Sequence, residues 1–397
     1  MRKEILLEDE RGRGFAAVVR GGPYLFVAGS DGHRDPATEQ IVPALAGQAE
    51  AQCRNSYGRV RRRLEQCGYG GDRAVQIQNY TSGQEWRLAR MGLWPEYFGT
   101  TEHGLAVSFG AQAKMSGINM ITTVVLALAP EVERVAVVPQ PEPGRAARVV
   151  RAGPFVYVIG VRGYGRNPLT GEQPPEETPE AFGAQLRCCY DSLRAHLQKA
   201  GADVGDFVRV DACLRDVNRV GDYQAFCRDY CGGTVPFAGH AVGVPLGARG
   251  EQEIGGIAAA PGVPREVAWL DERQERAQAV RAGGLIFVSG CLGARDAADR
   301  RWLPELASDK AGQARQALRR LEAGLGRFGA GLESVLRLDI FLRDIYFEDE
   351  LARLAREVFG PATPAMSFVG AELPGYGEVE LSAIAADPAT DDLTRPE

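Results

Sequence analysis

The sequence predicts an α+β protein made of three tandem domains, each with the element order β-β-α-β-α-β-β. A Val-Arg-x-Gly segment followed by a short apolar run ending in Gly occurs three times, at 19–29, 150–160 and 280–290. Downstream landmarks recur in each copy, separated by 133 and then 128 residues. They are Gln52, Gln185 and Gln313, then Gly68, Gly201 and Gly329, then Gly99, Gly232 and Gly360. Self-similarity at a fixed spacing indicates a repeated architecture.

Each copy opens with two predicted strands and continues with a helix headed by the repeated Gln. Apolar residues recur along this helix at alternating spacings of four and three. They are Cys53, Tyr57, Val60, Leu64 and Cys67, then Leu186, Tyr190, Leu193, Leu197 and Ala200, then Ala314, Leu318, Leu321, Leu325 and Phe328. Such spacing predicts a helix with one buried face. The Gly that follows suits the end of a helix.

A third strand, a second helix and a closing pair of strands complete each copy. The third strand is clearest at 208–214 and 336–342, where apolar and polar residues alternate at first. Asp216 and Asp344 follow these strands and are expected to cap the second helix rather than to act in catalysis. The predicted domains are 13–130, 145–260 and 275–387, joined by Pro-containing linkers at 139–144 and 260–264. We expect residues 388–397 to form a flexible acidic tail.

Bulk properties restrict the functional class. The chain has 397 residues, 45% of them hydrophobic and 25% charged, which is ordinary for a globular protein. A net charge of −6 argues against a nucleic-acid partner, and the absence of a long apolar run argues against a membrane span. The charged N-terminus does not resemble a signal peptide, and the eight Cys contain no Cys-x-x-Cys pair. We therefore expect a cytoplasmic protein that uses neither metal nor cofactor.

The repeated features resemble the Rid superfamily of reactive-intermediate deaminases, also called the YjgF family. They are the apolar strand ending in Ser289-Gly290, the Gln-headed helix ending in Gly, the strand end at 341–344, and the closing strand at 378–385. The resemblance covers roughly residues 13–387 and is strongest in the third copy. It implies Rid/chorismate-mutase-like domains. Members form homotrimers with sheets in a central barrel, helices outside, and active clefts between subunits.

Carried over to this chain, the resemblance implies an intramolecular pseudo-trimer with a central β-barrel, outer helices and three non-equivalent clefts. Because tethering gives a high effective concentration, one chain replaces three subunits. We therefore expect a monomer that binds a small-molecule substrate.

The sequence departs from the family where its deaminases carry a catalytic Arg, in a Pro-Ala-Arg-Ser segment that holds a substrate carboxylate. The corresponding segments are 101–105, 235–240 and 363–367, and none contains Arg; Met366 occupies the position in the third copy. The family's water-positioning Glu corresponds to Ser382, with Glu380 two residues earlier, and to Gly255, with Glu253 two earlier. The usual imine-deaminase constellation is absent from all three copies.

Four residues of these segments are candidates for chemistry. His103 and His240 lie in the segment that lines the family's cleft and could act as acid or base; the alternative is a polar residue beside a strand end with no role. Cys291, which follows Ser289 in the cleft-lining loop, is a possible nucleophile or binding residue; the alternative is a small packed side chain.

The remaining candidates lie in the first copy and on the last strand. The divergent stretch 79–87 holds Tyr80, Glu85 and Arg87, which could bind an anionic or aromatic ligand and move a proton; the alternative is an ordinary loop and amphipathic helix. Glu380 is a possible acid or base, with a solvent-facing strand residue as the alternative. Ser382 is a possible substrate contact.

Three functions remain open. The first is a specialised enzyme that acts on a small carboxylated or imine/enamine-type intermediate at one inter-domain cleft, by hydrolysis or acid/base elimination, as part of biosynthesis. The second is a hydrolase or lyase like the chorismatases, which resemble fused Rid-type domains and which the chain resembles loosely around 80–98. The third is a pseudo-trimer that has lost catalysis and binds a ligand or a protein. An enzyme predicts one cleft with converging polar groups, whereas a scaffold predicts three apolar or blocked clefts.

Overall fold

A computed structural model describes residues 1–9, 14–35, 37–83, 86–99, 106–139, 146–175, 181–246, 250–270, 273–297 and 300–390, with the main chain alone at 86–91 and 106–112. Three units follow one another. The first contains β1 (Lys3–Glu8), β2 (Ala16–Gly21), β3 (Tyr24–Asp31), α1 (Ala49–Gln66), β4 (Ala74–Thr81), α2 (Trp86–Phe98), β5 (Ala106–Gln112) and β6 (Ile121–Leu128).

The second unit contains β7 (Arg134–Val138), β8 (Val149–Ala152), β9 (Phe155–Arg162), α3 (Ala181–Gln198), β10 (Phe207–Leu214), α4 (Val220–Tyr230), β11 (Ala238–Gly243) and β12 (Gln252–Ala259). The third contains β13 (Arg265–Trp269), β14 (Ala277–Ala282), β15 (Leu285–Leu292), α5 (Lys310–Gly326), β16 (Val335–Leu342), α6 (Glu348–Phe359), β17 (Ala365–Gly370) and β18 (Val379–Ala386). The order expected from the sequence is present in each unit, but the leading strands β1, β7 and β13 were missed. Each pairs antiparallel with the strand that follows it.

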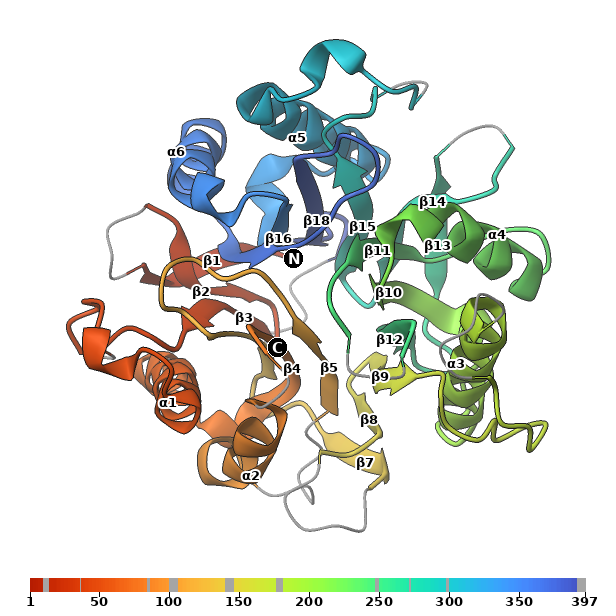
Figure 1. The fold of residues 1–397 in the computed structure, drawn as a ribbon, viewed down its shortest axis with the longest axis horizontal. Helices are drawn as coiled ribbons and strands as arrows, with labels where there is room; N and C mark the ends of the chain where they lie inside the picture. The colour runs from red at the N-terminus through yellow and green to blue at the C-terminus, as the bar shows by residue number, and fades with distance from the viewer. Residues whose placement is uncertain are drawn as a thin grey trace.

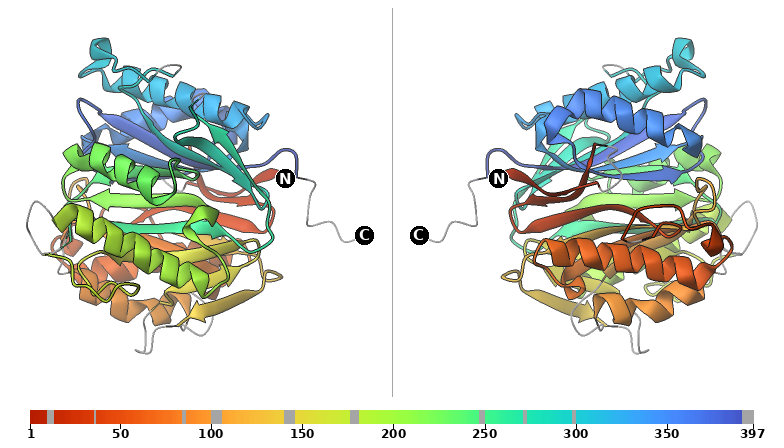
Figure 2. Two further views of the ribbon diagram at one scale, coloured as in Figure 1. Left: turned by 90° about the vertical axis from the view of Figure 1, so that its right-hand side faces the viewer. Right: turned by 90° about the vertical axis from the view of Figure 1, so that its left-hand side faces the viewer.

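The strands form two large sheets. The second unit makes a six-stranded sheet in the order β11-β10-β12-β9-β8-β7, and the first and third units share a twelve-stranded sheet. The two units of the larger sheet join through β17 and β2, at the pair Ala365 and Ala16. In the described residues β11 packs against β15 and β5 against β9 without a ladder of paired residues. As expected, the strands lie inward and the helices outside (Figures 1 and 2), but in the described residues the two sheets do not join into one closed, hydrogen-bonded barrel.

The predicted helical stripes face the sheets. Tyr57 and Leu64 on α1, Leu193 on α3 and Leu321 on α5 are completely buried. The repeated Gln has the same structural role in every unit, shown by Gln313: its Oε1 accepts a hydrogen bond from Glu378 N, and its Nε2 donates to the carbonyls of Leu306 and Tyr376. It thereby ties the helix to the segment before the last strand.

The predicted helix caps are confirmed. Asp216 and Asp344 each accept a hydrogen bond from the main-chain N–H two residues ahead, at the start of the turn that leads into α4 or α6.

A ring of buried polar side chains connects the three units at their centre. Arg209 donates to Asp211 of its own unit and to Asp339 of the third unit. Arg337 donates to Asp339 and to Gln78 of the first unit, and Gln78 donates to Asp211 of the second. Gln78, Asp211 and Asp339 are separated by the same 133 and 128 residues as the repeat landmarks. The ring therefore contains the same position of every copy, together with Arg209 and Arg337.

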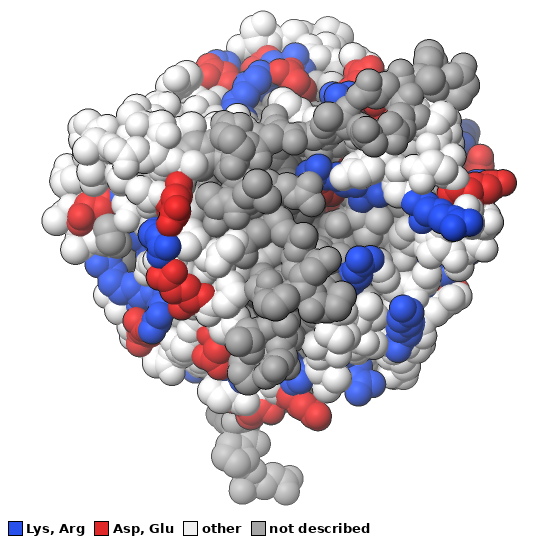
Figure 3. Space-filling model, turned by 60° about the horizontal axis from the view of Figure 1, so that its bottom comes forward, with Lys and Arg blue, Asp and Glu red and all other residues white. Residues whose placement is uncertain are grey.

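The chain ends and the surface show three further features. The amino group of Met1 donates to the carbonyls of Asp387 and Thr390, so the start of the expected tail is held beside β1. On the face in Figure 3, basic and acidic side chains are interspersed. All eight cysteines are free thiols, and no helix in the described part of the chain has the length and hydropathy of a membrane span.

Candidate functional site

The junction where β11 meets β15 brings together four of the residues singled out from the sequence. Ser289, Gly290 and Cys291 lie on β15, Glu380 lies on the neighbouring strand β18, and His240 comes from β11 of the second unit. The main-chain N–H of Gly239 donates to Ser289 Oγ at 3.3 Å, which joins the two units. Gly290 is needed here, because a methyl group in its place would overlap a carboxylate oxygen of Glu380.

Glu380 is a buried carboxylate with an unusual protonation equilibrium. Its side chain is 6% exposed and lies in register with Phe341 on β16 and Leu292 on β15. Burial raises its pKa to about 7, against the opposing effect of Arg276, Arg320 and Arg300. Since an acid or base works best when its pKa is near the working pH, Glu380 can give or take a proton at neutral pH.

Three arginines from three segments of the third unit line one small hollow of about 10 Å³ beside Gly290 and Cys291. Arg276 precedes β14, Arg300 follows β15 in a turn, and Arg320 lies on α5. Burial lowers the pKa of Arg300 to about 9, reinforced by the charges of Arg276 and Arg320. The Nε of Arg300 is buried and has no hydrogen-bond partner among the described residues. Sequence reasoning missed these arginines, because they are far apart in the chain and belong to no motif.

A second, mainly apolar hollow adjoins the first on the side of the second unit. Its walls include Val210, Tyr223 and Phe237, and Arg276 lines both hollows. One arginine therefore separates a cationic hollow from an apolar one. Their lining suits an anionic group attached to an uncharged body, but at about 10 and 30 Å³ each has room for little more than one water molecule, so a ligand enters only if the lining side chains move.

The imidazole of His240 faces the centre of the molecule. Its Nδ1 lies 3.3 Å from Asp211 Oδ1, and its ring centre lies 4.4 Å from that of Phe341. Burial lowers its pKa to about 4, although Asp211 opposes the shift. The expectation that His240 titrates near neutral pH is therefore wrong, because a fully buried imidazole loses the hydration that stabilises its charged form.

The side chains of the other candidate residues at this junction interact with main-chain carbonyl groups. Ser289 Oγ donates to Ala277 O at 2.8 Å, and Ser382 Oγ donates to Val288 O at 3.1 Å. Cys291 Sγ lies 3.2 Å from Ser289 O, and burial raises the thiol pKa to about 11 despite the charge of Arg320. Cys291 is therefore a neutral thiol at pH 7, whereas a nucleophile needs a lowered pKa.

Of the candidates from the first copy, only Tyr80 has a described side chain, and it lies at the centre of the molecule rather than at this junction. Tyr80 is 1% exposed and packs in a central cluster with Cys213 and Phe341, its counterparts in the other two units. His103 and Glu85 lie outside the described residues, and Arg87 lies on α2 where only the main chain is described.

The other two junctions differ in what their described residues offer. Between the third and first units, Phe15 packs on Phe368 with ring centres 6.1 Å apart, and Met366 joins the same apolar cluster. Facing the first unit, the Glu253 of β12 is already paired with Arg162. Neither junction shows a cationic hollow in the part of the chain that the structure describes.

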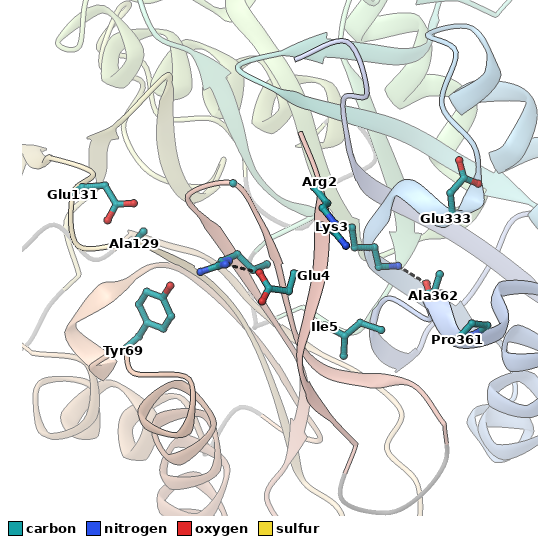
Figure 4. A pocket seen from close by; sticks show the side chains of 12 residues that line it. Arg2, Lys3, Glu4, Ile5, Tyr69, Ala129, Glu131, Glu333, Pro361 and Ala362 are labelled. Atoms are coloured by element: carbon teal, nitrogen blue, oxygen red, sulfur yellow. Dashed lines mark hydrogen bonds and ion pairs between the residues drawn. The ribbon is translucent and has the colours of Figure 1, made fainter. Parts of the chain in front are cut away.

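A larger hollow of about 810 Å³ lies beside β1, between the first and third units. Figure 4 shows two interactions among the residues around it: Arg20 pairs with Glu4, and Lys3 donates to Ala362 O. Burial lowers the pKa of Lys3 to about 8, partly offset by Glu333. Because cations and carboxylates alternate around it, this hollow has no clear preference for a ligand charge.

Comparison with known proteins identifies the family. Residues 271–387 match the family model described as Endoribonuclease L-PSP. RutC family protein UK114 of Drosophila melanogaster is 34% identical over 109 residues, which are 27% of this chain and 76% of that protein. The chain belongs to the Rid superfamily. The family match falls on the third copy, where the resemblance in sequence is strongest.

Solved structures give the fold of a larger part of this Rid chain. A chorismatase structure aligns with a TM-score of 0.51 at 16% identity, covering 79% of this chain and 93% of that one. A YjgF/YER057c/UK114 family member from Mycobacterium tuberculosis has 32% identity and a TM-score of 0.26, covering 31% of this chain and 99% of that one. The chorismatase likeness shows a shared mixed α/β fold.

The register of the strands shows which residues occupy the position of the family's catalytic arginine in this Rid protein. Met366 pairs with Leu338 on β16, and Gly239 pairs with Val210 on β10, so the two occupy the same position in their units. At the candidate junction this position is thus a glycine, and the cationic groups come from the third unit instead. The described residues contain no group of three or more His, Cys, Asp or Glu placed to hold a metal ion.

Proposed function

We propose that this Rid protein is an enzyme that hydrolyses a small carboxylic acid with an electron-rich double bond, such as an enamine or an enol ether. The reaction takes place at the junction of the second and third units. The observation that carries this proposal is the carboxyl group of Glu380, which has a pKa of about 7 beside a hollow lined by three arginines. A partly protonated acid and a cationic hollow are what such a reaction requires.

The chemistry follows from the charges. The substrate carboxylate lies against the arginines, and its apolar body lies towards Tyr223 and Phe237. Protonated Glu380 gives its proton to the terminal carbon of the double bond, which leaves a cationic carbon bonded to nitrogen or oxygen. Water adds to that carbon, and loss of the amine or alcohol leaves a 2-oxo acid. One proton of the water leaves with the amine or alcohol and the other restores the Glu380 acid, so the atoms and charges balance.

A chorismatase-like hydrolysis is the second candidate. The chorismatase structure shares the fold, and chorismate carries an enol ether next to a carboxylate, so the same protonation step applies. A non-catalytic binding protein is disfavoured, because a scaffold was expected to show only apolar or blocked clefts.

We also infer that the chain is an intramolecular counterpart of a Rid trimer and works as a monomer. The support is the central ring, in which each unit supplies its equivalent position to the next. Because these equivalent residues already bond to one another within one chain, none of them remains to bond to a partner chain.

The test is turnover of two compounds, 2-aminoacrylate generated in situ and chorismate, followed as ammonia and pyruvate release. Glu380→Gln should lower kcat/KM by about 100-fold or more, the usual effect of losing a general acid. In the wild type, kcat/KM should fall as pH rises through about 7, because only the protonated acid is active. Glu357→Gln, an exposed residue of α6, is the charge-matched control. Turnover that is unchanged in Glu380→Gln would exclude this mechanism.

A further inference from the structure

The turn that follows β3 in the first unit is built like the turn that follows β15 in the third unit. Glu39 and Arg300 occupy the same place in it, with φ angles of 59° and 58°. The main-chain carbonyl of each accepts a hydrogen bond from an arginine five residues earlier, Arg34 at 3.1 Å and Arg295 at 3.0 Å. The two turns are thus built alike and differ in the side chain at their left-handed position.

The helix residue that faces this turn is also equivalent in the two units. Arg59 on α1 donates from Nη1 to Asp31 O at 2.9 Å, and Arg320 on α5 donates from Nη1 to Leu292 O at 2.6 Å. Both guanidiniums are buried, with 1% and 5% of the residue exposed. Each is therefore fixed to the end of the neighbouring strand by the same bond.

The charge opposite this guanidinium is reversed between the units. In the first unit Glu39 forms a two-pronged ion pair with Arg59, of which the Nε–Oε1 bond is 2.9 Å long. In the third unit the residue at the position of Glu39 is Arg300, which lines the same hollow as Arg320. Burying like charges together is costly unless an anion lies near them, and Glu380, with a pKa of about 7, is only partly ionised at neutral pH. Further along the hollow, Arg276 adds a third cation where the first unit has Phe15.

The second unit shows a third version of this place: neither of the two positions carries a charge, and Asn167 of the turn donates to the buried carboxylate of Asp191 on α3. Its turn has Gly171 at the left-handed position, with φ of 75°, and Ser192 occupies the place of Arg59 on α3. At this place the first unit therefore has an internal ion pair, the second has no charged pair, and the third has two arginines.

We propose that Arg300 and Arg320 form the anchor for the substrate's carboxylate, and that the residue at the left-handed turn position decides whether a unit accepts an anion. The anion takes the place that the Glu39 carboxylate occupies in the first unit. Planar guanidiniums match the two oxygens of such a group. This inference deepens the proposed function and rests on it for the identity of the ligand, but it concerns binding, which is measured without turnover.

The experiment is calorimetric titration of the full chain with pyruvate, and separately with inorganic phosphate, together with the thermal midpoint of unfolding. The wild type should bind pyruvate with a single site per chain. Arg300→Glu should weaken this binding by roughly tenfold or more, since it replaces an attractive charge with a repulsive one. The same variant should raise the midpoint in the absence of anion, because it restores the pair seen between Glu39 and Arg59.

Two further variants separate the explanations. Arg300→Gln should weaken binding without raising the midpoint, since it removes a charge and makes no ion pair. Arg315→Glu, an exposed position of α5, repeats the change in net charge and should bind as the wild type does. Absence of saturable binding to the wild type, or equal binding by Arg300→Glu, would overturn the anchor. Binding of phosphate alone would overturn its assignment to a carboxylate.

The two proposals can fail separately. Glu380→Gln should still bind pyruvate, and more tightly than the wild type, because it removes a partial negative charge beside the same arginines. If the wild type binds pyruvate at this site but turns over neither 2-aminoacrylate nor chorismate, the anchor stands and the proposed reaction fails. If turnover depends on Glu380 but Arg300→Glu leaves the KM unchanged, the reaction stands and the anchor fails.

Discussion

Arg209 of the second unit lies with its Nη2 2.7 Å from Asp339 Oδ2 of the third, and both residues are almost completely buried. Although burial opposes ionisation, Arg337 and Arg209 hold the pKa of Asp339 well below its usual range. Gln78, the equivalent of Asp339 in the first unit, contributes an amide that donates to Asp211 and accepts from Arg337. One amide thereby closes a ring that holds two arginines and two aspartates.

Breaking this ring should destabilise the whole chain. Arg209→Met leaves Asp211 and Asp339 without a partner shared between their units, and such a loss typically costs about 3–5 kcal/mol. Chemical denaturation followed by circular dichroism measures the change. Arg54→Met removes an arginine that pairs with two glutamates at the surface of α1, and it should change stability little. Similar effects of the two variants would show that the ring is not a principal connection.

Removing the Glu380 carboxylate should stabilise the protein at alkaline pH while abolishing activity. The pKa of Glu380 is raised in the folded state from 4.5 to about 7, so the folded protein binds this proton more tightly than the unfolded chain. The contribution is complete below pH 4.5 and is lost as pH rises through 7. The loss is about 3 kcal/mol at most, at 1.36 kcal/mol per pKa unit.

The comparison to make is the free energy of unfolding of wild type and Glu380→Gln at pH 5 and pH 8. The difference between the variants should shift in favour of Glu380→Gln at pH 8, and the subtraction cancels titration of other groups such as His240. An equal difference at both pH values would mean that Glu380 has an ordinary pKa.

The thiol of Cys291 should be dispensable for turnover and slow to react. Burial raises its pKa to about 11, so less than one thiol in a thousand is ionised at pH 7. Cys291→Ala should keep kcat within about twofold of the wild type, because it removes no charge and little volume. Rapid and complete alkylation of Cys291 at pH 7, read by mass spectrometry, would contradict this assignment.

The chain should be a monomer of 42.8 kDa in solution. Light scattering coupled to size exclusion gives the mass directly, over a range of concentrations. A mass of three chains would contradict the inference that the units of one chain replace separate subunits.

The sequence predicted the repeated features of this fold well, because each has a local physical cause. The helical stripes, the Asp216 and Asp344 caps and the order of elements follow from periodicity and capping chemistry. The leading strands were missed because all three lie outside the predicted domains, at 3–8, 134–138 and 265–269. The expected central barrel is not confirmed as a closed one, since strands of different units in the described residues also meet without a ladder of hydrogen bonds.

The candidate site was predicted only in part, because a site depends on residues from distant segments. Ser289, Glu380 and Cys291 were found from the motifs of the third copy. Arg276, Arg300 and Arg320 carry no motif, and arginines are common at protein surfaces. One signal was present in the sequence: Arg300 and Glu39 are as far apart as the Gln landmarks of the same two copies, at 261 residues. Comparing the copies at this spacing would have revealed the reversal of charge.

Among the residues that the structure describes, a cationic hollow lies at one junction, which gives an expected stoichiometry of one ligand per chain. A homotrimer presents three identical clefts, so its ligands bind in a ratio of three per assembly and its sites can influence one another. Here one equivalent of a tight inhibitor per chain should abolish all activity, and the saturation curve should be hyperbolic. The other two junctions then only need to hold the units together, as the packing of Phe15 on Phe368 does.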